Sequence, residues 1–282
     1  MISENICKDL KQKENRNTER RAEICVSALK GDNIYELKEL IATLGAKEKK
    51  FRVLAADLVC PGDTAVLVIP IDESAPKGRL ILPQQQVIRE LLEAGVVSIC
   101  VNETELKSLI YDKGIRPALV ITDSQVFDLV SAILPEYIPL TSFSILMARY
   151  KGFFDTAVRG IAAVEKLKDG DKVLISEGCT HHRQCNDIGT VKIPRWLSEY
   201  IGKDVLIETS SGRDFPEDLS EYAVVIHCGG CMLTEKEMLY RMKCAIDQDV
   251  PFTNYGITIA YTQGILKRST AIFPQLADVL GN

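Results

Sequence analysis

Histidine, long apolar runs and excess positive charge are all scarce in this chain of 282 residues. The longest apolar run, near Thr64–Ile71, is interrupted by Pro70 and falls well short of the roughly 20 residues that a membrane-spanning helix needs. The net charge of −5 argues against a nucleic-acid-binding surface. The first 23 residues carry 11 charges, which argues against a signal peptide. We therefore expect a cytoplasmic protein with no nucleic-acid and no membrane partner.

Cysteine, by contrast, is plentiful, with nine residues. Without a secretory signal, disulfides are not expected, and thiols serve as core residues, ligands or nucleophiles. All three histidines lie in two short segments that also contain cysteine, 179–182 and 227–231. This co-localisation is the most informative feature of the sequence. Cysteines at positions 60, 100 and 244 lie in apolar patterns and are predicted to be core residues.

Strand-like apolar runs alternate with amphipathic helix-like segments from about residue 51 onward. This alternation predicts an α/β fold in which parallel or mixed sheets are covered by helices. We expect two consecutive domains, at 51–140 and 141–282, after a short segment at 1–46. No internal repeat is evident. The expected strands are 65–71, 96–101, 118–122, 172–176, 205–208, 223–226 and 251–254.

Two of the predicted strands run directly into the cysteine segments. Residues 172–176 lead to Glu177-Gly178-Cys179, and residues 223–226 lead to His227-Cys228. Ligands of open α/β sheets bind beyond the carboxyl ends of the strands. Both cysteine segments are therefore expected at the same edge of one sheet.

The spacing of Cys228 and Cys231 allows two thiolates to bind one metal centre, and the two glycines between them leave the turn unobstructed. Thr234 and Glu237 fit a capping box, so a helix should begin at this site, with its positive end favouring thiolates. Three thiolates with nearby imidazoles suit either zinc or an iron–sulfur cluster. The alternatives are buried thiols with core histidines, or a redox or nucleophilic dithiol. Cys185 is a possible spare ligand.

At these residues the sequence resembles the HydF family of FeFe-hydrogenase maturation factors. The matching segments are Glu-Gly-Cys-Thr-His-His at 177–182, His-Cys-Gly-Gly-Cys-Met at 227–232 and Val-Pro-Phe-Thr-Asn-Tyr-Gly at 250–256. Upstream, residues 72–84 resemble the dimerisation domain of the family. The resemblance covers roughly residues 24–282.

This resemblance implies a 4Fe–4S cluster held by Cys179, Cys228 and Cys231, with His181 and His227 as further cofactor-binding candidates. The fourth position on the unique iron is left open between these histidines, solvent, a carboxylate and an imported ligand. It also implies a homodimeric scaffold that carries the di-iron precursor of the hydrogenase active site. Such a scaffold works with radical-SAM maturases and delivers the precursor to apo-hydrogenase. The alternatives are a zinc-stabilised binding module and a thiol-dependent enzyme.

The resemblance has one large departure at the amino terminus. Family members begin with a Ras-like GTPase domain, whereas this sequence contains no Gly-x-x-x-x-Gly-Lys-[Ser/Thr] phosphate-binding loop. A strand at 24–28 followed by a helix at 34–44 resembles only the last strand and helix of such a domain. We therefore expect residues 1–46 to be a remnant of a GTPase domain. We also expect that the chain has no catalytic residues and does not hydrolyse GTP.

Overall fold

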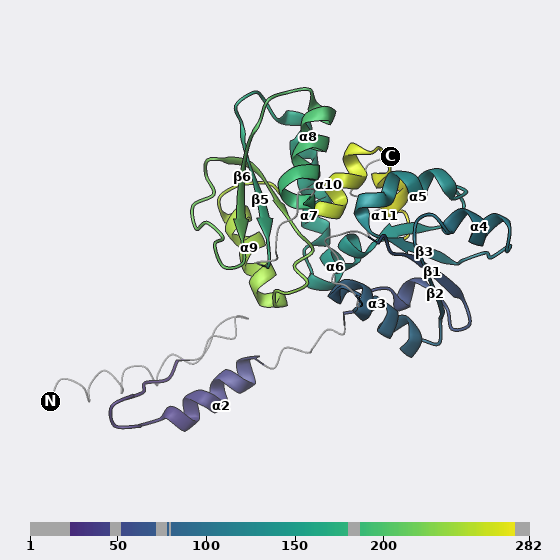
Figure 1. Ribbon diagram of the computed structural model, residues 1–282. Helices are drawn as coiled ribbons and strands as arrows, with labels where there is room; N and C mark the ends of the chain where they lie inside the picture. Colours follow the sequence, from purple (N-terminus) through teal and green to yellow (C-terminus); the bar gives the residue numbers. More distant parts are fainter. Residues whose placement is uncertain (1–22, 46–51, 72–77, 79, 180–186, 274–282) are drawn as a thin grey trace. The chain divides into compact units, whose positions relative to one another are not determined.

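The computed structural model describes residues 23–45, 52–71, 78, 80–179 and 187–273 (Figure 1). The chain divides into two compact units, 1–52 and 53–282. In the first unit, helix α2 (Ile34–Gly45) confirms the predicted helix. The predicted strand at 24–28 is wrong, because its backbone pairs only through an isolated bridge from Ser27 to Asp32 across a turn. Without a neighbouring strand in the described part of this unit, the segment has no sheet to join.

The second unit begins with a four-stranded parallel sheet in the order β2-β1-β3-β4. Helices follow each strand, as the alternating pattern predicts. The predicted strand at 65–71 is the central strand β1, and its interior position explains why four of its five residues are fully buried. The strands are β1 (Thr64–Val68), β2 (Val97–Val101), β3 (Leu119–Thr122) and β4 (Leu140–Ser142). The helices are η2 (Ala56–Leu58), α3 (Leu82–Glu93), α4 (Leu106–Tyr111), η3 (Ser124–Val126), α5 (Phe127–Ile133) and α6 (Phe143–Lys151).

A second four-stranded parallel sheet follows, in the order β6-β5-β7-β8. All four of its predicted strands are present, to within a few residues at each end. The strands are β5 (Lys172–Glu177), β6 (Leu206–Ser211), β7 (Tyr222–His227) and β8 (Phe252–Asn254). The helices are α7 (Phe154–Gly160), η4 (Ile161–Lys166), η5 (Ile188–Lys192), α8 (Ile193–Ile201), α9 (Glu235–Asp247), α10 (Tyr255–Thr262) and α11 (Leu266–Thr270).

The two sheets have the same strand order, and this reveals an internal repeat. The absence of a repeat, expected from the sequence, is therefore wrong. The last strand and helix of each half align without a gap, 139–152 with 251–264, and a left-handed glycine ends both helices (φ +82° at Gly152 and +72° at Gly264). Sequence similarity within this pair is confined to a few positions with structural roles, which hides the repeat. The identical pairs are Pro139 and Pro251, Thr141 and Thr253, Ile145 and Ile257, Ala148 and Ala260, and Gly152 and Gly264.

The two equivalent helices, α6 and α10, pack against each other where the halves meet. The Ser144 hydroxyl on α6 donates to the Asn254 side-chain oxygen at 3.2 Å and accepts from the backbone N–H of Gly256 at 3.2 Å. A side chain at Gly256 would lie 2.9 Å from the Ser144 Cβ, so the glycine permits this close approach. The carboxyl end of β8 is thereby joined directly to the first half.

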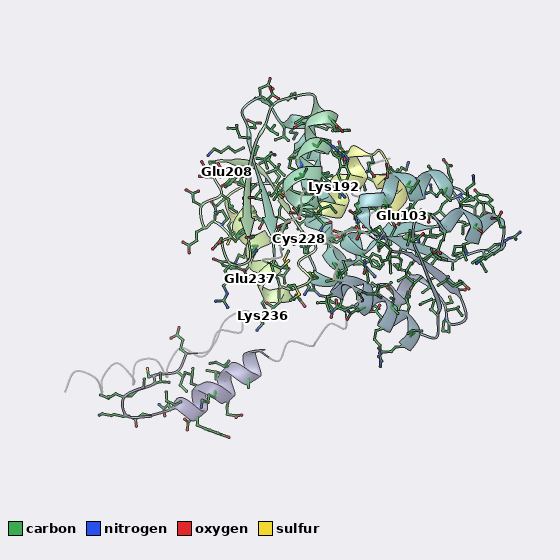
Figure 2. All side chains as sticks on the ribbon, viewed as in Figure 1. Glu103, Lys192, Glu208, Cys228, Lys236 and Glu237 are labelled. Atoms are coloured by element: carbon green, nitrogen blue, oxygen red, sulfur yellow. The ribbon has the colours of Figure 1, made fainter. Side chains whose placement is uncertain are left out.

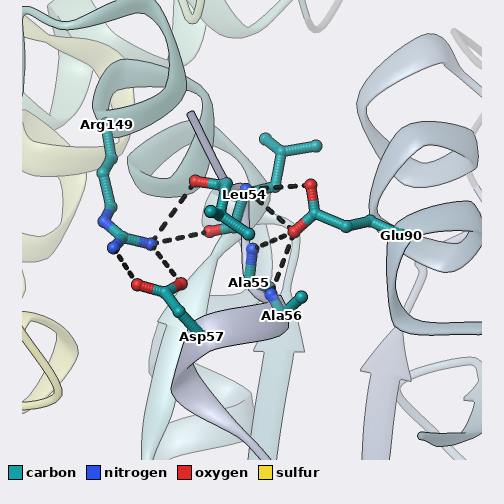
Figure 3. A network of polar contacts seen from close by, with 7 residues as sticks. Leu54, Ala55, Ala56, Asp57, Glu90 and Arg149 are labelled. Atoms are coloured by element: carbon teal, nitrogen blue, oxygen red, sulfur yellow. Dashed lines mark hydrogen bonds and ion pairs between the residues drawn. The ribbon is translucent and has the colours of Figure 1, made fainter. Parts of the chain in front are cut away.

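Polar contacts also fix the carboxyl-terminal end of α6 within the first half (Figure 3). The Arg149 guanidinium donates to the Leu54 carbonyl at 3.2 Å and pairs with the Asp57 carboxylate, which lowers the pKa of Asp57. The Glu90 carboxylate on α3 accepts the backbone N–H groups of Leu54, Ala55 and Ala56 at 2.8–3.0 Å. Such charge-assisted bonds give α6 a defined position, which matters for the site described next.

Candidate metal centre

The two cysteine segments lie at the same edge of the second sheet, as their sequence positions predict. Strands β5 and β7 are parallel neighbours, and Ser176 is the register partner of His227. The backbone N–H of Cys228 donates to the Ser176 carbonyl at 2.9 Å, so pairing continues one residue past the end of β7. Cys179 follows β5 by two residues, so its segment and that of Cys228 leave the sheet side by side.

Cys228, labelled in Figure 2, directly follows the end of β7. Its sulfur accepts backbone N–H groups from Gly178 at 3.1 Å and from Gly230 at 3.4 Å. Its pKa is raised to about 12, mainly by burial and less by the neighbouring Cys179 and Cys231, while the two N–H groups act to lower it. The free thiol is therefore protonated at neutral pH, and a bound cation would have to displace that proton.

Cys179 and Cys231 are half-buried, and the charge of each raises the pKa of Cys228. Burial raises the pKa of Cys179, followed by the charges of Cys231, Glu177 and Asp187. Burial also raises the pKa of Cys231, while backbone N–H groups and the Lys151 ammonium lower it. Gly178 and Gly230, which precede Cys179 and Cys231, both donate to the Cys228 sulfur, so the three predicted ligands lie at the same end of the sheet.

The turn between Cys228 and Cys231 depends on its glycines. Gly230 has φ of +63°, and a side chain there would lie 2.4 Å from the Met238 sulfur. The turn leads into α9, whose first turn is capped by the Thr234 hydroxyl, which accepts the Glu237 N–H at 3.2 Å. The predicted N-cap is therefore confirmed. The Glu237 side chain, instead of closing the capping box, accepts from Arg241 Nε at 2.8 Å.

His227 is fully buried behind the thiols. Its Nδ1 lies 2.8 Å from the Cys228 carbonyl oxygen, and its Nε2 lies 3.3 Å from Arg241 Nη1. Burial lowers the His227 pKa to about 4, with a further lowering by the Arg241 charge. The neutral ring therefore donates from Nδ1 to the carbonyl and accepts at Nε2 from Arg241. In this arrangement both nitrogens are engaged away from the sulfurs, and His227 orients the Cys228 backbone.

His181, the other predicted imidazole, and Cys185 lie outside the described residues. Among the residues that are described, no group of three or more His, Cys, Asp or Glu side chains is arranged as a finished metal site. Asp187 is a buried residue whose carboxylate accepts the N–H groups of Gly189 and Thr190 at 3.1 and 2.9 Å.

Two charged residues complete the site, and one of them, Lys151, could not be found from the sequence. Lys151 comes from the first half, and its Nζ donates to the Leu233 carbonyl at 2.5 Å. Arg241 is nearly fully buried and donates to the Gly212 carbonyl at 2.6 Å. The sequence marks Lys151 only as a charged residue on a helix, where a solvated position is the usual expectation.

The remaining cysteines correct one prediction. Cys60 and Cys100 are exposed and Cys244 is half-buried, so the first two are not core residues. Cys100 lies on β2, an edge strand on which every residue is exposed or only partly buried. An apolar sequence pattern alone does not distinguish an edge strand from a central one.

The described part of the chain contains no helix long and apolar enough to cross a membrane. Comparison with known proteins identifies two domains. The hydrogen maturase F dimerization domain matches residues 54–152, and the hydrogen maturase F tetramerization domain matches residues 155–272. No curated protein matches the chain. Among solved structures, a 5,10-methylenetetrahydrofolate dehydrogenase from the silkworm Bombyx mori covers 84% of this chain and 93% of its own length, at 12% identity and a TM-score of 0.25. Similarity at that level carries no functional argument.

The matched segments coincide with the two sheets and their helices, and the second contains Cys179, Cys228 and Cys231. Both domains are named for self-association, so assembly with further copies is part of how the chain works. Because the two matches span residues 54–272, the chain belongs to the HydF-type hydrogenase maturases and takes part in hydrogenase maturation.

Proposed function

We propose that this chain is an iron–sulfur scaffold that binds a 4Fe–4S cluster through Cys179, Cys228 and Cys231 and carries the di-iron precursor of the hydrogenase active site. The observation that supports it best is geometric: the Cys228 sulfur accepts the N–H of Gly178, which precedes Cys179, and the N–H of Gly230, which precedes Cys231. The family resemblance extends the proposal to radical-SAM maturases and apo-hydrogenase as partners.

The residues present fit such a cluster chemically. Thiolates are the usual ligands of iron–sulfur clusters, and N–H groups directed at the sulfurs tune them. Gly178 and Gly230 supply two such groups to Cys228, and their donation continues when the thiol becomes a thiolate. With three protein ligands, a bound cluster would leave one iron open to an exchangeable ligand.

The surrounding residues hold the ligands in place. His227 fixes the Cys228 carbonyl, and Arg241 fixes His227, while the Phe252 ring stacks on the imidazole at 5.8 Å between centroids. Such outer contacts orient ligands and adjust their properties. A role for His227 or His181 as a direct ligand stays a prediction from the sequence.

Self-association is proposed to use β2 in the first half. Its sheet has two edges, β2 and β4, and every β4 residue is buried, whereas β2 has exposed positions. An open edge of a parallel sheet presents unpaired backbone groups that can join a second copy across a two-fold axis. The apolar strand β1 is central and has no free edge.

Single replacement of each proposed ligand by serine tests the cluster. Under anaerobic reconstitution with iron and sulfide, the wild type should take up about four irons per chain. Cys179→Ser, Cys228→Ser and Cys231→Ser should each lose most of the cluster, because serine oxygen is a harder ligand that suits iron poorly. Cys244→Ser is the matched control, since this half-buried thiol lies on α9 outside the proposed ligand set.

The readout is electron paramagnetic resonance of the reduced proteins together with iron content. A Cys228→Ser protein with a wild-type signal would sink the ligand assignment. Tight zinc binding without iron uptake would support a zinc-stabilised module instead. A reactive dithiol that binds neither metal would support a thiol-dependent enzyme.

A further inference from the structure

One face of α6, in the first half, runs along the cysteine turn of the second half. A side chain at Gly229 would lie 3.2 Å from the Met147 Cβ and 3.8 Å from the Ser144 hydroxyl oxygen. Two turns after Ser144 on the same helix, Lys151 donates to the Leu233 carbonyl. Residues 144, 147 and 151 share one helix face. The helix therefore forms a wall of the site over the whole length of the turn.

Lys151 places a positive charge in this buried wall, and burying a charge is unfavourable in free energy unless another group compensates for it. Its side chain is 8% exposed, and burial lowers its pKa, against a raising by Cys231 and Glu235. Among the described residues, no carboxylate lies within ion-pair distance of its Nζ. Buried charges are normally paired or bound to a counter-charge. The turn carbonyl satisfies one N–H donor, and Cys231 and Glu235 are the groups whose charges act on the ammonium.

We propose that Lys151 is a positioning residue of the cysteine site: the dimerisation domain supplies the ammonium that holds the Cys231–Leu233 turn and stabilises the negative charge that gathers on the thiolates and their ligand. This inference rests on the proposed function. An added electron makes an iron–sulfur centre more negative, so a nearby fixed cation favours the reduced form. Lys151 should therefore raise the reduction potential of the bound cluster.

Two variants separate charge from hydrogen bonding. Lys151→Met removes both, whereas Lys151→Gln retains a donor for the Leu233 carbonyl but removes the charge. Lys151→Arg keeps the charge. Lys236→Met is the matched control, because Lys236 is an exposed lysine on α9, five residues from Cys231 (Figure 2). All four are compared with the wild type as full chains, reconstituted anaerobically and reduced stepwise with dithionite.

The measurement is the midpoint potential from titrations followed by electron paramagnetic resonance. We expect Lys151→Met and Lys151→Gln to disfavour the reduced cluster about tenfold, which is about 59 mV for a one-electron couple. Lys151→Arg should recover most of this shift, and Lys236→Met should remain near the wild-type potential.

If the cluster of Lys151→Gln has the wild-type reduction potential, the inference is overturned, whatever the result for Lys151→Met. The charge of Lys151 would then have no effect on the cluster, and its role would be purely structural. Equal shifts in Lys236→Met and Lys151→Gln would overturn it too, since any nearby charge would then suffice. A wild-type chain that takes up no iron would overturn the proposed function along with it.

Discussion

Burial of His227 should make the free energy of unfolding depend on pH in mildly acidic solution. In the folded chain the pKa of His227 is lowered to about 4 by burial and by the Arg241 charge, from an ordinary value of 6.5. As the pH falls, the unfolded chain therefore takes up a proton at this histidine at a higher pH than the folded chain does. The stabilisation from the neutral ring is fully present above pH 6.5 and is lost as the pH falls through about 4.

The size of this effect follows from the change in proton affinity. Lowering the pKa from 6.5 to about 4 corresponds to about 3 kcal/mol, at about 1.4 kcal/mol for each tenfold change. That is a large part of the roughly 5–15 kcal/mol that stabilises a typical domain. Protonation would also place a cation 3.3 Å from the Arg241 guanidinium, which explains the direction.

Urea unfolding of the metal-free, reduced protein between about pH 7 and pH 4.5 measures the effect. Trp196, the single tryptophan, packs against the core from α8 in the second half and reports its unfolding by fluorescence. His227→Gln is the comparison, because it cannot take up a proton. Carboxylates titrate in both proteins, so the difference between them isolates the histidine. Parallel stability curves for the two proteins would refute the reasoning.

Two further predictions concern assembly and the contact between the halves. Val97→Lys places a charge at an exposed position of the open edge β2. Light scattering should therefore show a smaller assembly than the wild type at equal concentration. An unchanged mass would exclude this edge as the interface. Gly256→Ala would bring a methyl group to 2.9 Å from the Ser144 Cβ and should lower the free energy of unfolding by about 1–3 kcal/mol, measured by urea denaturation. A neutral effect of the alanine would mean that the junction relaxes easily.

The sequence predicts those features of the fold and site that depend on local pattern. The second sheet and the convergence of Cys179 and Cys228 follow from strands that run directly into the motifs. The order of the strands does not follow, so the central position of β1 and the exposure of Cys100 were missed. Lys151 was missed for a related reason. Its contact with Leu233 joins residues 82 positions apart, and no spacing rule links them.

The repeat shows a similar limit. The two halves share strand order, yet their similarity in sequence is strongest only where β4 and β8 lead into α6 and α10. There, threonine, isoleucine, alanine and glycine keep the same roles in packing and in ending the helix. Elsewhere each half needs only apolar residues in the right places, and many sequences satisfy that requirement.

The two halves have equivalent sheet edges, but among the described residues the three thiols converge at only one of them. The register of the strands makes Thr122 the counterpart of His227, so Asp123 stands where the second half has Cys228. Ser142 and Asn254 cap the corresponding helices in the same way. The proposed site therefore combines thiols from one half of the chain with an ammonium from the other half of the same chain. We therefore expect one cluster per chain, whatever the number of chains in the assembly.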